Sequence, residues 1–243
     1  MTVRKVIPKS TAIKCAVFLI FLVVLSTPHL SHAEDNDLAK YYNDFLHRGD
    51  ATDANEPVIA RMDRKLTFVA VNASSKADEE IISTLGSITK LTNMPLRYGS
   101  VRENFNAFIM YSDNLYETYK GVGSGFIKSF LKDDALYNKI GSKLSGENLC
   151  YRFVFYRGGY IAGGILFVNN RALNTDMHAR CLLMWGLGLY GFEPNKTSSL
   201  ASILAQDNIS KLTTLDEAAV KDFYSRDVPF ELPITDFLQE IRK

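Results

Sequence analysis

The sequence has few of the residues from which metal centres and disulfide-rich scaffolds are built. Its 243 residues include four histidines, three cysteines and one tryptophan. Three cysteines are too few for a small domain stapled by several disulfides, and a three-histidine zinc site would need nearly every histidine. Neither charge dominates, with 28 basic and 27 acidic residues, and the sequence shows no basic stripe of the kind that nucleic-acid-binding proteins carry. We therefore expect no nucleic-acid partner.

Long hydrophobic runs are also scarce. The one prominent run, Ala16–Leu25, is shorter than the roughly 20 apolar residues that a transmembrane helix needs. It follows a basic start and precedes small residues at Ser31 and Ala33, which is the order found in a secretory signal peptide. We predict that residues 1–33 are removed by cleavage between Ala33 and Glu34, which gives a periplasmic or secreted protein. The alternative is an uncleaved segment that serves as the protein's membrane anchor.

Cleavage would change the composition of the mature protein. The net charge would fall from +1 to −3, because the first 33 residues hold four basic residues and no acidic ones. Two cysteines would remain, Cys150 and Cys181, in an oxidising compartment. We predict that they form a disulfide that contributes about 3 to 4 kcal/mol to stability, and the alternative is two separately buried thiols.

Hydrophobic patterning predicts an α+β fold. Strands are predicted at 66–71 and 107–111, and a hairpin at 150–156 and 160–168, where two glycines join two runs of aromatic and β-branched residues. A capping signal at Ser75 opens an amphipathic helix that carries Ile81, Ile82 and Leu85 on one face. Residues 121–125 are predicted to form a flexible glycine-rich loop. A second capping signal, Thr214–Glu217, opens a helix near the end of the chain.

The segment from Cys181 to Phe192 predicts a buried helix, because it is apolar on every side. Gly186 and Gly188 each cost a helix about 1 kcal/mol relative to alanine, so we expect another backbone to pack closely against them. Gly191 suits the end of this helix. We predict one globular domain over residues 60–243, preceded by a polar lead-in segment at 34–59.

Several motifs of this domain occur together in a known family. Cys181-Leu-Leu, the Gly188–Asn195 segment and the Leu212–Asp216 segment with Phe223-Tyr224 resemble the bacterial exported family called domain of unknown function 2927. The likeness covers about residues 60–227. The family is similar to zincin metallopeptidases, in which a helical His-Glu-x-x-His motif binds zinc and supplies the catalytic glutamate. The resemblance implies a single zincin-like domain, a mixed sheet of about four or five strands with the Ser75 helix and the buried glycine-containing helix packed on it.

The same resemblance implies that the catalytic positions are lost. The two histidine positions fall on Met184 and Gly188, and the glutamate position falls on Trp185. A thioether is a poor zinc ligand, an indole is no base, and glycine has no side chain. We therefore expect no cofactor and no metal, and interpret the protein as a non-catalytic zincin-like protein that binds an unidentified partner of the cell envelope or the secretion machinery. This interpretation predicts that no ionisable groups converge in a cleft against Met184–Gly188.

Two further candidate residues define the alternative functions. A hydrolase with unfamiliar catalytic residues would use Asp216 and His178, and would need a polar cleft beside the Cys181 helix. We favour structural roles for both: His178 as a surface or capping residue, and Asp216 as a carboxylate in the first turn of a helix. An exported chaperone or assembly factor would instead expose an apolar patch around Tyr111–Tyr119.

Overall fold

The structure is a computed structural model that describes residues 32–49, 57–62, 65–121, 123–157 and 159–242. The chain divides into two units, Met1–Asn36 and Asp37–Lys243, and the fold below is that of the second unit. The predicted signal segment lies outside the described residues up to residue 31, and the predicted cleavage point, Ala33–Glu34, lies in the first turn of helix α2 (His32–Phe45). In the part of the chain that is described, no helix combines the length and apolarity needed to cross a membrane.

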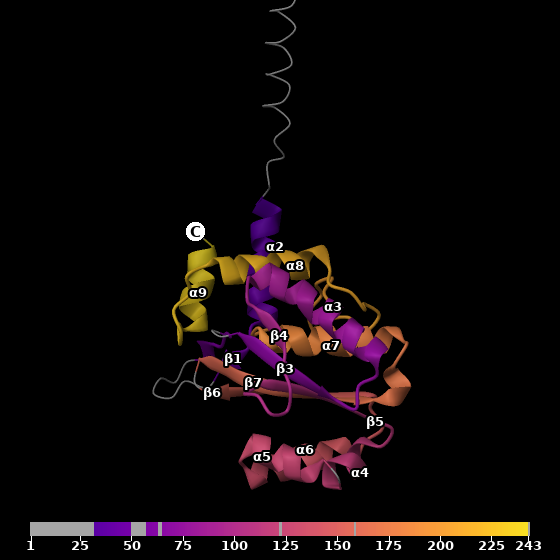
Figure 1. Cartoon of the computed structure of the whole chain (residues 1–243). Coiled ribbons are helices and arrows are strands. Elements are labelled where there is room, and N and C mark those ends of the chain that lie inside the picture. The colour runs from indigo at the N-terminus through magenta and orange to yellow at the C-terminus, as the bar shows by residue number, and fades with distance from the viewer. Residues whose placement is uncertain (1–31, 50–56, 63–64, 122, 158, 243) are drawn as a thin grey trace, which may run out of the picture. The chain divides into compact units, whose positions relative to one another are not determined.

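A mixed five-stranded sheet forms the centre of the domain, in the order β4-β3-β5-β7-β6 (Figure 1). The strands are β3 (Leu66–Val71), β4 (Leu96–Tyr98), β5 (Ala107–Ser112), β6 (Cys150–Arg157) and β7 (Tyr160–Asn169). Four of them are parallel, and β6 pairs with β7 as an antiparallel edge strand. A short separate pair joins β1 (Arg48–Gly49) to β2 (Val58–Ile59). The predicted strands and hairpin are confirmed.

Helices cover both faces of this sheet (Figure 1). On one face lie α3 (Ser75–Thr92) and α7 (Asp176–Leu189), with α8 (Thr214–Ser225) packed against α3. On the other face lie α4 (Leu115–Lys120), α5 (Ser124–Leu131) and α6 (Asp134–Leu144), while the 3-10 turn η1 (Asn170–Ala172) precedes α7 and α9 (Ile234–Ile241) ends the chain. The predicted α+β class is therefore confirmed. The predicted loop at 121–125 is shorter than expected, because α5 begins at Ser124.

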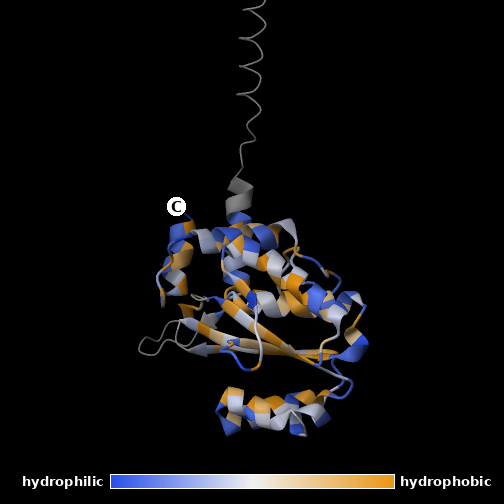
Figure 2. Cartoon of the chain, viewed as in Figure 1, coloured by the Kyte–Doolittle hydropathy of each residue, from blue (hydrophilic) through white to orange (hydrophobic). Residues whose placement is uncertain are grey.

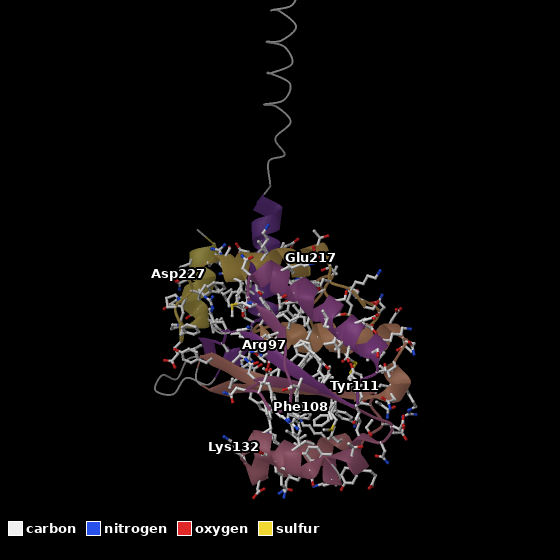
Figure 3. The ribbon with its side chains drawn as sticks, viewed as in Figure 1. Arg97, Phe108, Tyr111, Lys132, Glu217 and Asp227 are labelled. Atoms are coloured by element: carbon white, nitrogen blue, oxygen red, sulfur yellow. A yellow bond between two sulfur atoms is a disulfide. The ribbon has the colours of Figure 1, made fainter. Side chains whose placement is uncertain are left out.

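Alternating side chains of the strands fill two separate cores. Phe108 points toward α4–α6, where it packs with Ile127 and Phe167, whereas Ile109 belongs to the core beneath α3 and α7. Side chains fill the space between the sheet and α4–α6 (Figure 3), and the hydrophobic residues of α5 and α6 face the sheet (Figure 2). The period-2 alternation of a strand buried on both faces accounts for this division.

Part of the predicted lead-in segment belongs to the domain. Tyr41, Tyr42 and Phe45 of α2 are fully buried in the core. Tyr41 packs against Phe192, and Tyr42 packs against Phe223, so this helix fills the space beside the carboxyl-terminal helices. The interpretation of 34–59 as a lead-in is corrected for this stretch, because three closely spaced aromatic residues outweigh its polar composition.

Helix α7 is buried as predicted, and Gly191 ends it. Gly191 has a φ of 94°, and the amide of Phe192 donates to the carbonyl of Leu187 at 3.0 Å, as in a Schellman motif. The expected close contact at Gly186 comes from side chains of α3 and not from a backbone: an added Cβ would lie 2.6 Å from Ile88.

A disulfide joins Cys150, at the start of β6, to Cys181 in α7, which confirms the predicted pairing. Its half-cystines lie 31 residues apart in the sequence, and their Cα atoms are 6.4 Å apart. The bond therefore fixes the edge strand of the sheet against the helix that crosses beside it.

Replacing Cys150 and Cys181 by serine in the mature chain should lower the free energy of unfolding by about 3 to 4 kcal/mol, because the cross-link no longer restricts the unfolded chain. Denaturant unfolding measures this change. Reductant should destabilise the wild type by a similar amount and leave the double variant unchanged. Equal stability of the wild type and the double variant in the absence of reductant would contradict the prediction.

Candidate functional site

A pocket of about 260 Å³ opens between the edge strand β6 and helix α7. Its lining comes from three segments: β6, the middle of α7, and the residues that follow the end of α7. The lining residues are Arg152, Phe153, Val154, Tyr156, Met184, Trp185, Gly188, Phe192, Glu193 and Pro194. The pocket therefore lies against the three positions that the zincin resemblance singles out.

The strand side of the pocket follows from the alternation of β6. Val154 and Tyr156 pack against the core that contains α7, whereas Phe153 and Phe155 pack against the core beneath α4–α6. Arg152 shares the parity of Val154 and Tyr156, so the pleat of the strand directs all three toward α7. The disulfide at Cys150 continues the same row.

The helix side of the pocket contains no zinc-binding group. Met184 and Trp185 are 7% and 0% exposed, and Val154 packs closely on Gly188: an added Cβ there would lie 3.0 Å from Val154. A thioether, an indole and a bare backbone do not fit a zincin metal centre. Among the described residues, no three histidine, cysteine, aspartate or glutamate side chains are grouped so that they could hold a metal ion.

The third side of the pocket carries the carboxylate of Glu193. His47, which lies far from Glu193 in the sequence, contacts this carboxylate. The amide of Glu193 donates to the carbonyl of Phe45 at 2.7 Å, and the amide of His47 donates to the carbonyl of Gly191 at 2.7 Å. This backbone pairing places His47 Nδ1 against Glu193 Oε1. The His47 ring stacks on Tyr156 with a centroid distance of 3.4 Å, and the Tyr156 hydroxyl donates to Glu193 Oε1 at 3.1 Å.

These contacts shift the pKa values of two pocket residues. Hydrogen bonding from His47 lowers the pKa of the Glu193 carboxyl, burial opposes this shift, and the Tyr156 hydroxyl and the Arg152 charge add to the lowering. Burial, together with the nearby Glu193 carboxylate, raises the pKa of the Tyr156 hydroxyl, which keeps it a hydrogen-bond donor. Glu193 is thus an ionised acceptor whose partners come from the protein itself.

The expectation that no ionisable groups converge beside Met184–Gly188 is wrong, and the non-catalytic interpretation therefore keeps only the missing zinc ligands of α7 as its support. Arg152, Tyr156 and Glu193 all reach the pocket. It is the polar cleft that the hydrolase alternative requires, but neither His178 nor Asp216 lines it. The lining also lacks serine, threonine, cysteine and lysine, and the Tyr156 hydroxyl donates its hydrogen bond to the Glu193 carboxylate.

His178 lies elsewhere, and the expectation of a surface or capping role is wrong. It is fully buried in the first turn of α7, where both ring nitrogens have partners. Nε2 lies 2.8 Å from the Tyr111 hydroxyl and Nδ1 lies 2.6 Å from Glu80 Oε2. This chain of hydrogen bonds joins β5, α7 and α3, and we interpret it as a structural connection.

Asp216 is a buried cap at the start of α8. Thr213 is the N-cap residue, one position earlier than predicted, and the two side chains form a capping box. The carboxylate also accepts from the Tyr41 hydroxyl at 2.9 Å, from the Ser202 hydroxyl at 2.5 Å and from the amide of Ile203 at 3.2 Å. With its oxygens occupied by protein donors and no exposed surface, Asp216 suits a structural role.

The tyrosines considered for a chaperone surface are mostly buried. Tyr111 and Tyr119 are 1% and 0% exposed, and Tyr116 alone of the three is exposed, at 37%. Tyr119 and Tyr137 stack and exchange hydrogen bonds with each other's carbonyl oxygens. The apolar patch expected for an assembly factor is therefore absent from this described stretch.

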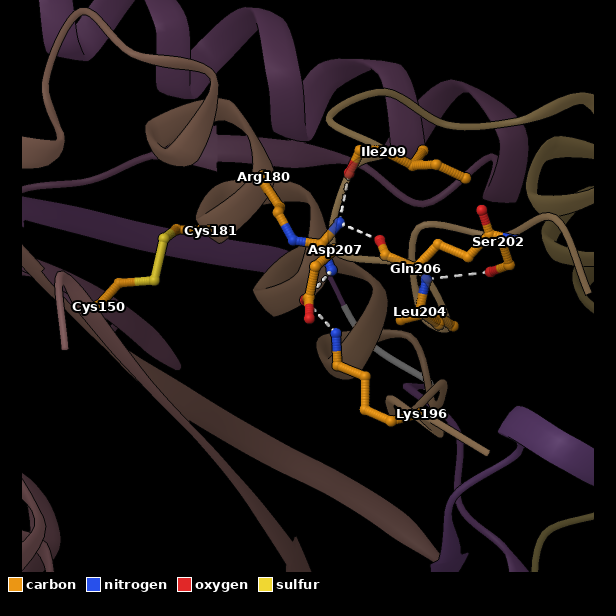
Figure 4. A network of polar contacts seen from close by, with 9 residues as sticks. All are labelled: Cys150, Arg180, Cys181, Lys196, Ser202, Leu204, Gln206, Asp207 and Ile209. Atoms are coloured by element: carbon orange, nitrogen blue, oxygen red, sulfur yellow. Dashed lines mark hydrogen bonds and ion pairs between the residues drawn. A yellow bond between two sulfur atoms is a disulfide. The ribbon is translucent and has the colours of Figure 1, made fainter. Parts of the chain in front are cut away.

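Arg180, a buried arginine of α7, holds this helix against the loop that follows it (Figure 4). Its guanidinium donates to the carbonyls of Gln206 and Ile209 and pairs with Asp207, which Lys196 also contacts. Burial lowers the pKa of Arg180, and Asp207 opposes that shift. The loop thus neutralises one of the two cations near the pocket.

Comparison with protein-family models gives no match for this chain, and comparison with curated proteins gives none either. Sequence reasoning missed Arg152, which belongs to no motif, and Glu193, which lies in the Gly188–Asn195 segment but at none of the catalytic positions that the resemblance implies. One signal was present: Arg152 is a single charge inside an aromatic and β-branched strand, with the parity of the cysteine that joins α7.

Replacing Asp216 by alanine should lower the free energy of unfolding by at least about 3 kcal/mol, because several buried donors lose their acceptor and each costs about 1 to 3 kcal/mol. Chemical denaturation measures the loss. The matched control is Asp236→Ala, which removes an exposed first-turn carboxylate from α9 and should cost under about 1 kcal/mol. Similar losses in the two variants would contradict the assigned role.

Replacing Glu193 by glutamine should destabilise the protein near neutral pH, by under about 1 kcal/mol because the side chain is 49% exposed. Because folding lowers the pKa of Glu193, its contribution is complete above the unfolded value of about 4.3 and is lost as the pH falls through the folded value. The difference in melting temperature between the two proteins should therefore shrink below about pH 4. In a His47→Gln background the difference should be small at every pH, and a difference that grows on acidification would refute the assignment.

Proposed function

We propose that this is an exported, non-catalytic protein with a zincin-like domain, which acts by binding a partner in the cell envelope or the secretion machinery. The observation that carries the proposal is the wall of the pocket between β6 and α7. Met184, Trp185 and Gly188 occupy it, at the positions where a zincin peptidase would have two zinc ligands and the catalytic glutamate. None of these three groups binds zinc well or accepts a proton.

The arrangement of the sheet supports the zincin-like part of the proposal. The resemblance implied a mixed sheet with the Ser75 helix and the Cys181 helix packed on it, and α3 and α7 pack on one face of a mixed five-stranded sheet. Fold likeness alone does not assign an activity. The proposal therefore depends on the chemistry of the pocket.

The remaining histidines give little support to a displaced metal centre. Of the two that would survive signal cleavage, His178 has protein partners at both nitrogens, and His47 is stacked on Tyr156 and contacts Glu193. The two histidines belong to different clusters. The carboxylate and the phenol of the pocket are hydrogen-bonded to each other, and no metal-binding group of side chains is found among the described residues, so the pocket suits recognition of a ligand better than hydrolysis.

The disulfide supports the exported part of the proposal. Disulfides persist in oxidising compartments and are rare where thiols are kept reduced, and Cys150 and Cys181 are joined. The predicted signal segment and the predicted periplasmic or secreted location agree with this bond.

Metal analysis of the purified mature protein tests the proposal. We expect substoichiometric zinc after dialysis, and a melting temperature that chelator does not change, because no metal contributes to folding. One zinc per chain, retained through dialysis and lost in a His47→Gln variant, would contradict the proposal and would identify a metal site at the rim of the pocket.

A further inference from the structure

Arg152 is a cation without a protein partner in a partly enclosed pocket. No residue in the described parts of the chain lies within hydrogen-bonding or ion-pair distance of its guanidinium. Burial lowers the pKa of this group, and the neighbouring Arg180 lowers it further, so both effects act against its charge. Arg152 is half-buried and water reaches its guanidinium, so the five donors of this group are open to a ligand.

Glu193, the acid whose charge acts on Arg152, already has partners within the protein. Glu193 is near enough to oppose the lowering of the pKa of Arg152, but its carboxylate accepts from Tyr156 and contacts His47. The second cation, Arg180, is paired with Asp207 and with loop carbonyls (Figure 4). The unpaired positive charge of this region therefore belongs to Arg152.

The rest of the pocket wall is largely apolar and small. Val154, Met184, Phe192 and Pro194 contribute apolar surface, and Gly188 allows α7 to approach Val154 closely, since an added Cβ would lie 3.0 Å from it. At about 260 Å³, the pocket is smaller than the roughly 300 to 1,000 Å³ of sites for drug-sized ligands. It suits one charged group on a short stem.

We propose that this pocket binds an oxyanion carried on a short apolar stem, with Arg152 as the principal donor. The planar guanidinium matches the two oxygens of a carboxylate or of a phosphate group. The inference deepens the proposed function, on which it rests, since the oxyanion would belong to the partner. An acidic side chain, a chain terminus and a phosphorylated group share this chemistry.

The single tryptophan makes the test direct, because Trp185 lines the pocket and no other residue contributes indole fluorescence. The mature protein is treated with chelator, dialysed to remove it, and then titrated with glutarate, with inorganic phosphate and with glutaramide, the uncharged counterpart of glutarate. We expect a saturable fluorescence change with at least one oxyanion and none with glutaramide. The tighter of the two oxyanions indicates whether the partner supplies a carboxylate or a phosphate group.

Variants assign the effect to Arg152. Arg152→Gln should weaken binding roughly 10- to 100-fold, the range for loss of charge-assisted hydrogen bonds, and Arg152→Lys should weaken it less. Arg102→Gln removes an exposed arginine outside the pocket and should leave the affinity unchanged. Glu193→Gln should tighten binding, because it removes a negative charge close to the incoming anion.

Three results would overturn the inference: no saturable response of the wild-type protein to either oxyanion, an equal response to glutaramide, or an affinity that Arg152→Gln leaves unchanged. The first two need no variant, so a folding defect in a variant does not obscure them. Retention of zinc would refute the proposed function and leave these chelator-treated titrations interpretable. The two failures are therefore distinguishable.

Discussion

The packing of α7 against the sheet is the interaction on which the rest of the structure depends. The helix is apolar around its whole circumference, so it must be covered on every side. β6 and β7 cover one side, and α3 covers another. The disulfide at Cys181 and the hydrogen bonds of Arg180 fix the second turn of the helix. The pocket lies beside this contact, where Arg152 and Tyr156 of β6 face Met184 and Gly188 of α7.

The sequence predicted the elements whose signals are local. β3, the β6–β7 hairpin and α7 have patterns that extend over a whole element. The disulfide was predicted because only two cysteines remain after the predicted signal segment. The segment of α2 was predicted only as a polar lead-in, because its three aromatic residues lie among polar ones. Their burial depends on Phe192 and Phe223, which lie far away in the sequence.

The site could not be predicted as a unit. Its members come from the segment after α2, from β6, from α7 and from the residues after α7, and backbone pairing between Phe45 and Glu193 brings the first and last of these together. The error over His178 has the same origin. Its partners, Glu80 and Tyr111, come from α3 and β5, so the sequence around His178 held no sign of its burial.

The proposed binding role depends on the residues that line the pocket between β6 and α7. Met184, Trp185 and Gly188 of α7 form one wall of the pocket, and the edge strand contributes Arg152 to the same lining. Burial disfavours the charge of Arg152, and an acidic ligand would give this guanidinium a partner. A hydrolase would need a nucleophile or an activated water, and among the lining residues only Glu193 and Tyr156 carry groups of that kind.

Crystals of the mature protein soaked separately with zinc and with glutarate, and examined for anomalous scattering and for ligand density, test this account most directly. The account predicts a carboxylate seated on the Arg152 guanidinium and no zinc beside Met184, Trp185 and Gly188. A zinc ion held in that pocket by His47 and Glu193, with Arg152 turned away from any bound acid, would contradict it.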